Sequence, residues 1–213
     1  MGFLVADVAG HGAAAAVMMA ALRSALAAFQ VFGRDRESAP QDVNSIVNEL
    51  AVPGMFITAF FVSLDPKTGM LYCGNCGHPP AFILRKNGNT ESDSKAGDLP
   101  LGIVPNIAPP TILMQLHEGD SLILYTDGIT EARSDKGEQF GDHKLSQAIS
   151  SASTGSALSI CDTIVQQLQL HENCPVPADD LPPPPGAPGG RAAGVRATRD
   201  VGLLPGRACG PGP

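Results

Sequence analysis

The chain has 213 residues, of which 43% are hydrophobic and 16% charged, and this balance suits one globular domain with an appendage. Its formal net charge of -7 argues against broad binding to nucleic acids or to anionic membranes. The five cysteines have irregular spacing, which excludes a disulfide framework, and the first residues lack the basic start of a signal peptide, so we expect a cytoplasmic protein.

The first part of the chain predicts a strand, two helices and a hairpin. Residues 2–7 are an apolar run that indicates a buried strand. Apolar residues at helical spacing predict one helix over residues 13–29 and a second over 41–51. Residues 55–64 are β-branched and aromatic, and the turn sequence DPKTG separates them from MLYCG, so a hairpin is expected here.

The second part predicts further strands and then two helices. Residues 81–85 indicate a strand that ends at an Asn-Gly turn. Residues 111–116 and 121–126 flank the sequence HEGD, which predicts a second hairpin. A helix is expected from about Gly141, and another over residues 156–170. Helices before and after antiparallel hairpins are typical of an α+β layered fold.

The composition changes after Leu181. Residues 182–213 contain eight prolines, eight glycines and four arginines. Such a segment buries too little apolar surface to offset the entropy of ordering it, so we expect disorder here.

Three acidic positions are candidate metal ligands: Asp7, Asp127 and the pair Asp179 and Asp180. Asp7 and Asp127 each follow an apolar strand and precede a glycine-containing turn, which places a carboxylate at a strand end. Mn²⁺ and Mg²⁺ prefer such oxygen ligands. Taken alone, an aspartate in this position is usually only a turn residue.

Several motifs in one order carry a family resemblance. The segment DVAGHGAAAAVMMAAL resembles the helix-leading signature of the SpoIIE-like (RsbU-type) serine/threonine phosphatases of the metal-dependent PPM superfamily. The central hairpin with its GHPP turn is similar to theirs, and LPLGI, YTDGITEA and ADD follow in the family's order. The resemblance covers residues 2–181.

The resemblance implies a four-layer α-β-β-α sandwich of two antiparallel sheets flanked by helices, incomplete at both ends. The family has a strand and an acidic motif ahead of DVAGHG, and a last strand where this chain has Pro182–Pro185, which cannot form a central strand. We therefore expect an N-terminally truncated phosphatase domain over residues 1–181, with its last strand missing, and a disordered tail over 182–213.

For the site, the resemblance implies two Mn²⁺ or Mg²⁺ ions. Asp7 would bridge the two ions, and the Val8 carbonyl would ligate one of them. Asp127 and Asp179 would complete the shell of the other, with Asp180 as the adjacent alternative. Asp7 and Asp127 are thus the expected catalytic residues.

The implied activity is hydrolysis of phosphoserine or phosphothreonine by direct attack of a metal-bound hydroxide. Phosphorylated signalling proteins, such as anti-sigma-factor antagonists, would be the substrates. No nucleic-acid or membrane partner is expected, and the sequence leaves the oligomeric state open. The alternative is a non-catalytic remnant or scaffold domain without a complete binuclear metal site.

Other polar residues have competing interpretations. Gly10 and Gly12 either let the backbone approach the metal site or form a simple turn, and His11 is more simply a turn histidine than a phosphate contact. His78 is expected to be structural. Cys73 and Cys76 have CxxC spacing without a second pair for zinc, so buried thiols are favoured.

Overall fold

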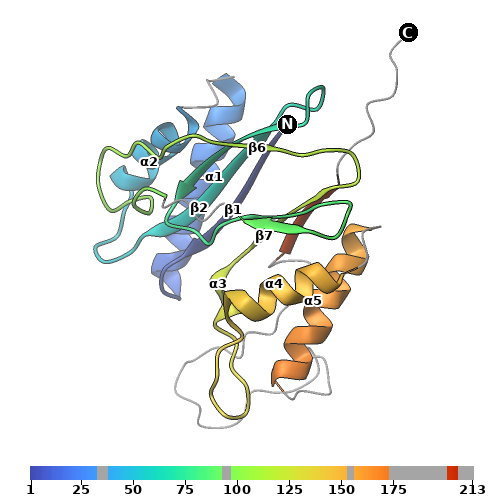
Figure 1. Cartoon of the computed structure of the whole chain (residues 1–213). Coiled ribbons are helices and arrows are strands. Elements are labelled where there is room, and N and C mark those ends of the chain that lie inside the picture. The colour runs from blue at the N-terminus through green and yellow to red at the C-terminus, as the bar shows by residue number, and fades with distance from the viewer. Residues whose placement is uncertain (33–37, 93–96, 153–155, 173–200, 206–213) are drawn as a thin grey trace. The chain divides into compact units, whose positions relative to one another are not determined.

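The structure is a computed structural model, and it describes residues 1–32, 38–92, 97–152, 156–172 and 201–205 (Figure 1). The chain divides into two compact units, each made of two stretches of sequence. The first unit contains Met1–Pro80 and Asp93–Leu116, and the second contains Ala81–Ser92 and His117–Pro213.

The first unit is a helix layer on an antiparallel sheet. Its strands are β1 (Gly2–Val8), β2 (Ile57–Leu64), β3 (Met70–Cys76) and β6 (Ile112–Gln115), in the spatial order β1-β2-β3-β6. Its helices are α1 (Ala13–Phe32) and α2 (Ala39–Glu49).

The buried residues of this unit follow the alternation of side chains between the two faces of the sheet. Met18 and Leu22 of α1, Val43 and Val47 of α2, and Ile57 and Ala59 of β2 belong to one buried cluster. Because successive side chains of a strand point to opposite faces, Thr58 and Phe60 lie on the other face. That second face is apolar too, with Phe60, Val62, Leu71, Cys73 and Ile112 all buried.

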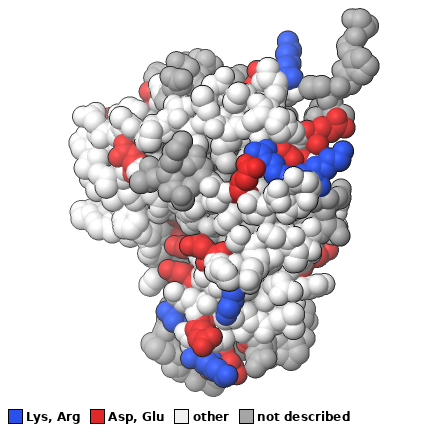
Figure 2. All heavy atoms as spheres, in the orientation of Figure 1, with Lys and Arg blue, Asp and Glu red and all other residues white. Residues whose placement is uncertain are grey.

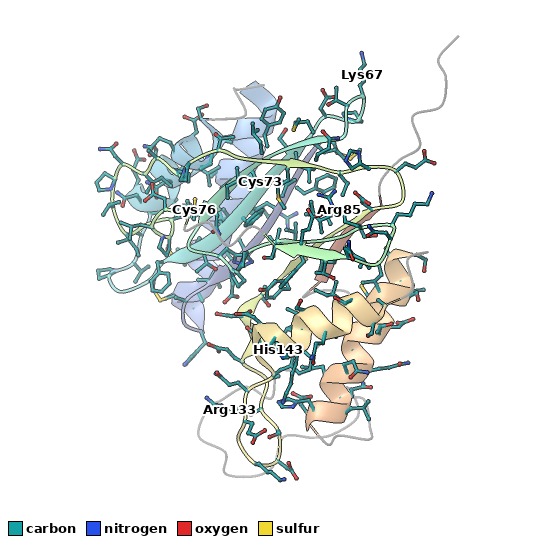
Figure 3. The ribbon with its side chains drawn as sticks, viewed as in Figure 1. Lys67, Cys73, Cys76, Arg85, Arg133 and His143 are labelled. Atoms are coloured by element: carbon teal, nitrogen blue, oxygen red, sulfur yellow. The ribbon has the colours of Figure 1, made fainter. Side chains whose placement is uncertain are left out.

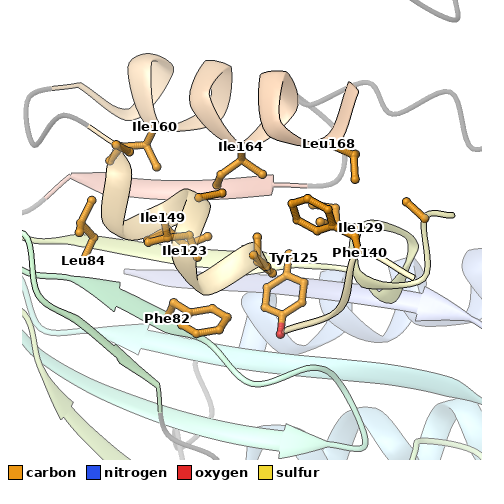
Figure 4. Close-up of a cluster of buried hydrophobic side chains, with 14 residues drawn as sticks. Phe82, Leu84, Ile123, Tyr125, Ile129, Phe140, Ile149, Ile160, Ile164 and Leu168 are labelled. Atoms are coloured by element: carbon orange, nitrogen blue, oxygen red, sulfur yellow. The ribbon is translucent and has the colours of Figure 1, made fainter. Parts of the chain in front are cut away.

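The second unit has the same construction. Its sheet has the order β5-β4-β7-β8, from β4 (Phe82–Leu84), β5 (Thr90–Ser92), β7 (Ser121–Tyr125) and β8 (Val201–Pro205), all paired antiparallel. Its helices are α3 (Asp127–Thr130), α4 (Gly141–Ser151) and α5 (Ala157–Glu172). Phe82 and Tyr125 stack with ring centroids 5.7 Å apart, and Ile149, Ile160 and Ile164 of the helices pack into the same cluster (Figure 4).

The α+β prediction is confirmed, since the chain forms two antiparallel sheets with helices packed on each. The predicted strands and helices recur with ends shifted by a few residues, and β5, β8 and α3 are additions. The four-layer order and the domain limits 1–181 and 182–213 stay predictions.

The predicted hairpin of residues 111–116 with 121–126 is wrong. β6 pairs with β3, whereas β7 pairs with β4, so the two strands belong to different sheets (Figure 1). The turn residues between them predict a change of direction, but they do not decide which partner each strand takes.

The structure also differs from the expectation that the last strand is missing and that residues 182–213 are a disordered tail. Within residues 182–213, the segment Val201–Pro205 forms β8, which pairs with β7 at the edge of the second sheet. Its sequence VGLLP is the most apolar part of a tail whose average composition conceals it. Proline is tolerated on an edge strand. The rest of this tail, 182–200 and 206–213, lies outside the described residues.

Within the described part of the chain, no helix combines the length and the apolar character that a membrane crossing requires.

Candidate metal centre

The first candidate ligand, Asp7, lies near the end of the edge strand β1. Leu4, Ala6 and Val8 pack against the cluster beneath the helices. The alternation of a strand therefore places the Asp7 side chain on the opposite face, where it is exposed.

The β1–β2 ladder decides where the backbone of Val8 points. The Ala9 N–H donates to the Phe56 carbonyl (2.9 Å), while Ile57, opposite Val8, exchanges its hydrogen bonds with Leu101 (3.0 and 2.8 Å). In an antiparallel pair, hydrogen-bonded and non-hydrogen-bonded positions alternate. Asp7 and Thr58 thus form a hydrogen-bonded pair, and the Val8 carbonyl points away from β2, as a role in metal ligation requires.

The segment after β1 is a glycine turn. Gly10 and Gly12 have φ of 97° and 81°, in the region that favours glycine. A Cβ at Gly10 would lie 3.1 Å from the Sδ atom of the flexible Met55 side chain, so the positive φ, rather than lack of space, selects glycine there. His11 is exposed. These observations support the turn interpretation of the glycines.

In the second unit, Asp127 directly follows the buried strand β7 and opens the one-turn helix α3. Its carbonyl accepts hydrogen bonds from the Glu131 N–H (2.8 Å) and the Thr130 hydroxyl (3.1 Å). The Asp127 side chain is exposed at this strand end. The short helix therefore fixes the backbone of Asp127 and leaves its side chain at the surface.

A second aspartate, Asp120, precedes the same strand and differs from Asp127. Its carboxylate accepts hydrogen bonds from Arg85 Nη1 (2.8 Å) and from the N–H groups of Lys86 and His117 (3.0 Å each). Burial raises the pKa of Asp120, but these hydrogen bonds and the Arg85 charge outweigh it, so the net pKa lies below its usual range. Arg85 also reaches Glu91. Asp120 joins two turns and has a structural role.

The predicted ligands are thus distributed over both units. Asp7 and Val8 belong to the first, Asp127 belongs to the second, and Asp179 and Asp180 lie outside the described residues. Over the described ranges, no group of three or more His, Cys, Asp or Glu side chains forms a potential metal site. Exposed carboxylates and a backbone carbonyl are hard oxygen donors, which fit Mn²⁺ or Mg²⁺. Their meeting around two ions stays a prediction.

The CxxC pair has no metal or redox geometry. Cys73 and Cys76 are both buried on β3 and form no disulfide within the described residues (Figure 3). They lie on opposite faces of the strand, because Cys76 packs in the cluster beneath the helices and Cys73 lies across from Val62. Burial, and next the Asp98 charge, raise the pKa of the Cys76 thiol to about 12, which suppresses the reactive thiolate. The interpretation as buried thiols is confirmed.

Three residues, Thr58, Asn75 and His78, form a polar network beside Asp7. Only His78 was among the residues that the sequence analysis singled out. The His78 Nδ1 atom lies 2.9 Å from the Thr58 hydroxyl. The Asn75 side chain accepts from the His78 N–H (2.8 Å) and donates to the His78 carbonyl (3.0 Å). Asn75 and His78 are only 4% and 5% exposed. Two sequence features could have pointed to this network: Thr58 is a polar residue within an apolar run, and Asn75 is an asparagine within a predicted strand.

The surface charges of the chain do not form one large patch of a single sign on the face drawn in Figure 2. On the face drawn in Figure 2, acidic and basic side chains are interspersed. This mixture gives no extended basic face there for a polyanion.

Comparisons with known proteins agree with this geometry. The solved structure of the RsbU and RsbW domains of a Mycobacterium tuberculosis protein superposes with a TM-score of 0.68 at 26% identity, covering 79% of this chain and 47% of that one. The catalytic domain of the serine/threonine protein phosphatase PstP, in complex with two manganese ions, gives a TM-score of 0.57 at 18% identity over 80% of this chain and 82% of that one. The fold is that of the PP2C-type (PPM) phosphatases.

The sequence comparison defines the family within that class. The family described as stage II sporulation protein E (SpoIIE) matches residues 1–181, and the chain belongs to this family. The phosphoserine phosphatase RsbU of Bacillus subtilis is 28% identical over 174 residues, which cover 79% of this chain and 52% of RsbU. The chain spans about half the length or less of the curated relatives it matches.

Proposed function

We propose that this chain is a phosphoprotein phosphatase domain that depends on Mn²⁺ or Mg²⁺ and hydrolyses phosphoserine or phosphothreonine. The observation that carries the proposal is the match of the SpoIIE family over residues 1–181, which includes exposed carboxylates at two strand ends, Asp7 and Asp127.

The proposed ligands are Asp7, the Val8 carbonyl, Asp127 and Asp179, with Asp180 as the adjacent alternative. When bound, divalent cations would make water a nucleophile at neutral pH and neutralise charge on the phosphoryl group. Asp7 and Asp127 would each supply a carboxylate from the end of a strand. The Val8 carbonyl suits this role because the β1–β2 ladder leaves it outside the sheet hydrogen bonds.

The proposed substrates are phosphorylated signalling proteins, such as anti-sigma-factor antagonists. The support is the similarity to RsbU, which is named a phosphoserine phosphatase. A protein substrate also agrees with the net charge of -7, which does not favour nucleic acid.

Hydrolysis of a chromogenic aryl phosphate by the purified chain, with and without Mn²⁺, tests the proposal. We expect metal-dependent turnover that Asp7→Asn and Asp127→Asn each reduce by about a hundredfold or more, because each removes a charged ligand. A phosphoserine peptide then tests the substrate class.

The matched control is Asp162→Asn, which neutralises an exposed aspartate of α5. It should retain wild-type turnover. A folded wild-type chain that binds no Mn²⁺ and shows no turnover would overturn the proposal and leave a scaffold domain.

A further inference from the structure

The inference concerns Thr130 in the one-turn helix α3, and it rests on the proposed role of Asp127 as a metal ligand. The Thr130 hydroxyl donates to the Asp127 carbonyl oxygen at 3.1 Å, and the Glu131 N–H donates to the same oxygen at 2.8 Å. Both distances lie within the ordinary range of protein hydrogen bonds or at its edge. Two donors thus converge on the backbone of the residue whose carboxylate is the proposed ligand.

Buried side chains anchor the chain on either side of Asp127. Tyr125, two residues before it, is 1% exposed and stacks on Phe82. Ile129, two residues after it, is also 1% exposed and belongs to the same buried cluster (Figure 4). The exposed Asp127 lies between these anchors, so its conformation depends on how well the turn of α3 is closed.

The helix α3 is weak by itself. It has four residues, and the first turn of a helix costs more conformational entropy than its first hydrogen bond offsets. Thr126, at the N-cap, makes no side-chain capping bond, and Gly128 within the turn adds backbone freedom. The bond from the Thr130 hydroxyl is therefore a large part of what closes this turn.

A second threonine of the same unit makes the same kind of bond in a different setting. The Thr163 hydroxyl donates to the Ser159 carbonyl at 2.9 Å, within α5. A threonine hydroxyl often bonds a carbonyl one turn earlier in a helix. Because α5 has 16 residues, one such bond adds little to its order. The comparison separates the bond itself from its place beside a proposed ligand.

From this geometry, we infer that Thr130 is a positioning residue for Asp127. Its hydroxyl and the Glu131 N–H hold the Asp127 carbonyl, and with it the direction in which the side chain leaves the backbone. Without the hydroxyl the turn opens more often, and the carboxylate points in a wider range of directions. Cation binding must then order the turn as well, which lowers the affinity.

Mn²⁺ affinity measured by titration calorimetry is the main test. We expect Thr130→Val, which keeps the β-branched shape and loses the hydroxyl, to weaken Mn²⁺ binding by about tenfold, as is typical when a residue that orients a metal ligand is removed. Thr130→Ser keeps the hydroxyl and should bind Mn²⁺ within about twofold of the wild type. The matched control Thr163→Val loses the same kind of bond in α5 and should bind Mn²⁺ like the wild type.

Amide hydrogen exchange of the metal-free chain gives a readout that needs no cation. The Glu131 amide should exchange at least about threefold faster in Thr130→Val than in the wild type or Thr130→Ser, because its bond to the Asp127 carbonyl opens with the turn. Thermal unfolding separates positioning from general stability. Thr130→Val and Thr163→Val should melt at similar temperatures, so that a difference in Mn²⁺ affinity between them reports on the position of Asp127.

The outcomes separate the two proposals. Wild-type Mn²⁺ affinity in Thr130→Val, or equal losses in Thr130→Val and Thr163→Val, would overturn the positioning role while the phosphatase proposal stands. Unchanged exchange of the Glu131 amide in Thr130→Val would also overturn the positioning role. A wild-type chain that binds no Mn²⁺ would overturn both proposals.

Discussion

The two ends of strand β7 carry one aspartate each, and they differ in almost every physical respect. Asp120, before the strand, is 4% exposed and accepts hydrogen bonds from Arg85, Lys86 and His117. Asp127, after the strand, is exposed at the start of a single helical turn. A carboxylate saturated by donors stabilises the fold, whereas an exposed one at a strand end is available to a ligand.

The largest effect that tests this comparison is on stability. Asp120→Ala should lower the free energy of unfolding by about 3 kcal/mol, because it removes one partner of a partly buried ion pair and leaves two backbone N–H groups without acceptors. Asp127→Ala should change it by less than about 0.5 kcal/mol, as is usual at an exposed site. Urea denaturation followed by circular dichroism measures both, and equal losses would refute the distinction.

A pH series sharpens the same contrast. The pKa of Asp120 is lowered in the folded chain, where Arg85 faces its carboxylate and Glu91 shares that arginine. Its contribution to stability is therefore present above the unfolded pKa, about 4, and is lost as the pH falls through the folded pKa.

The difference in unfolding free energy between the wild type and Asp120→Asn should thus stay constant from about pH 7 to 5 and narrow below about pH 4. A difference that widened on acidification would contradict the assigned direction of the shift.

The next effect concerns the arginine. Arg85 contacts Asp120 and Glu91 through two different nitrogens, at 2.8 and 2.5 Å. Arg85→Lys keeps the charge but loses the planar guanidinium, whose separate nitrogens contact the two carboxylates. We therefore expect a loss of about 1 kcal/mol in unfolding free energy. Glu91→Gln, which changes only the exposed partner, should have a smaller effect. A larger loss of unfolding free energy in Glu91→Gln than in Arg85→Lys would show that the contact with Glu91 is the important one.

The smallest effect is expected at the last residue of β7. The Tyr125 hydroxyl is 3.4 Å from Asp142 Oδ1, which is long for a hydrogen bond. Tyr125→Phe keeps the stacking with Phe82 and should cost less than about 1 kcal/mol in a thermal or urea unfolding assay. A larger loss would show that the hydroxyl has a stronger structural role than its distance indicates.

Local sequence signals predicted the elements well. The turn DPKTG correctly indicates the β2–β3 hairpin, since Gly69 has φ of 73° and its N–H bonds the Asp65 carbonyl at 2.8 Å. Turn chemistry of this kind acts within a few residues, so the sequence contains all of it.

Contacts between distant residues could not be predicted in the same way. Two of the three donors to Asp120, Lys86 and Arg85, are 34 and 35 residues away, and Thr58 and His78 are separated by 20 residues. Asp120 and Asp127 both adjoin an apolar strand, and only burial and donors distinguish them. The same reason explains the wrong hairpin of β6 with β7, because the choice of strand partner depends on the whole sheet.

The alternation of the chain between the two units has a consequence for synthesis. The first unit is completed only by β6, and by then β4 and β5 of the second unit have already been made. An isolated two-stranded hairpin is marginal in water, so β4 and β5 must wait for β7 to leave the ribosome. Neither unit is one continuous stretch of the chain. A single cut of the gene after Pro80 would separate β6 from the first unit, and a cut after Leu116 would separate β4 and β5 from the second.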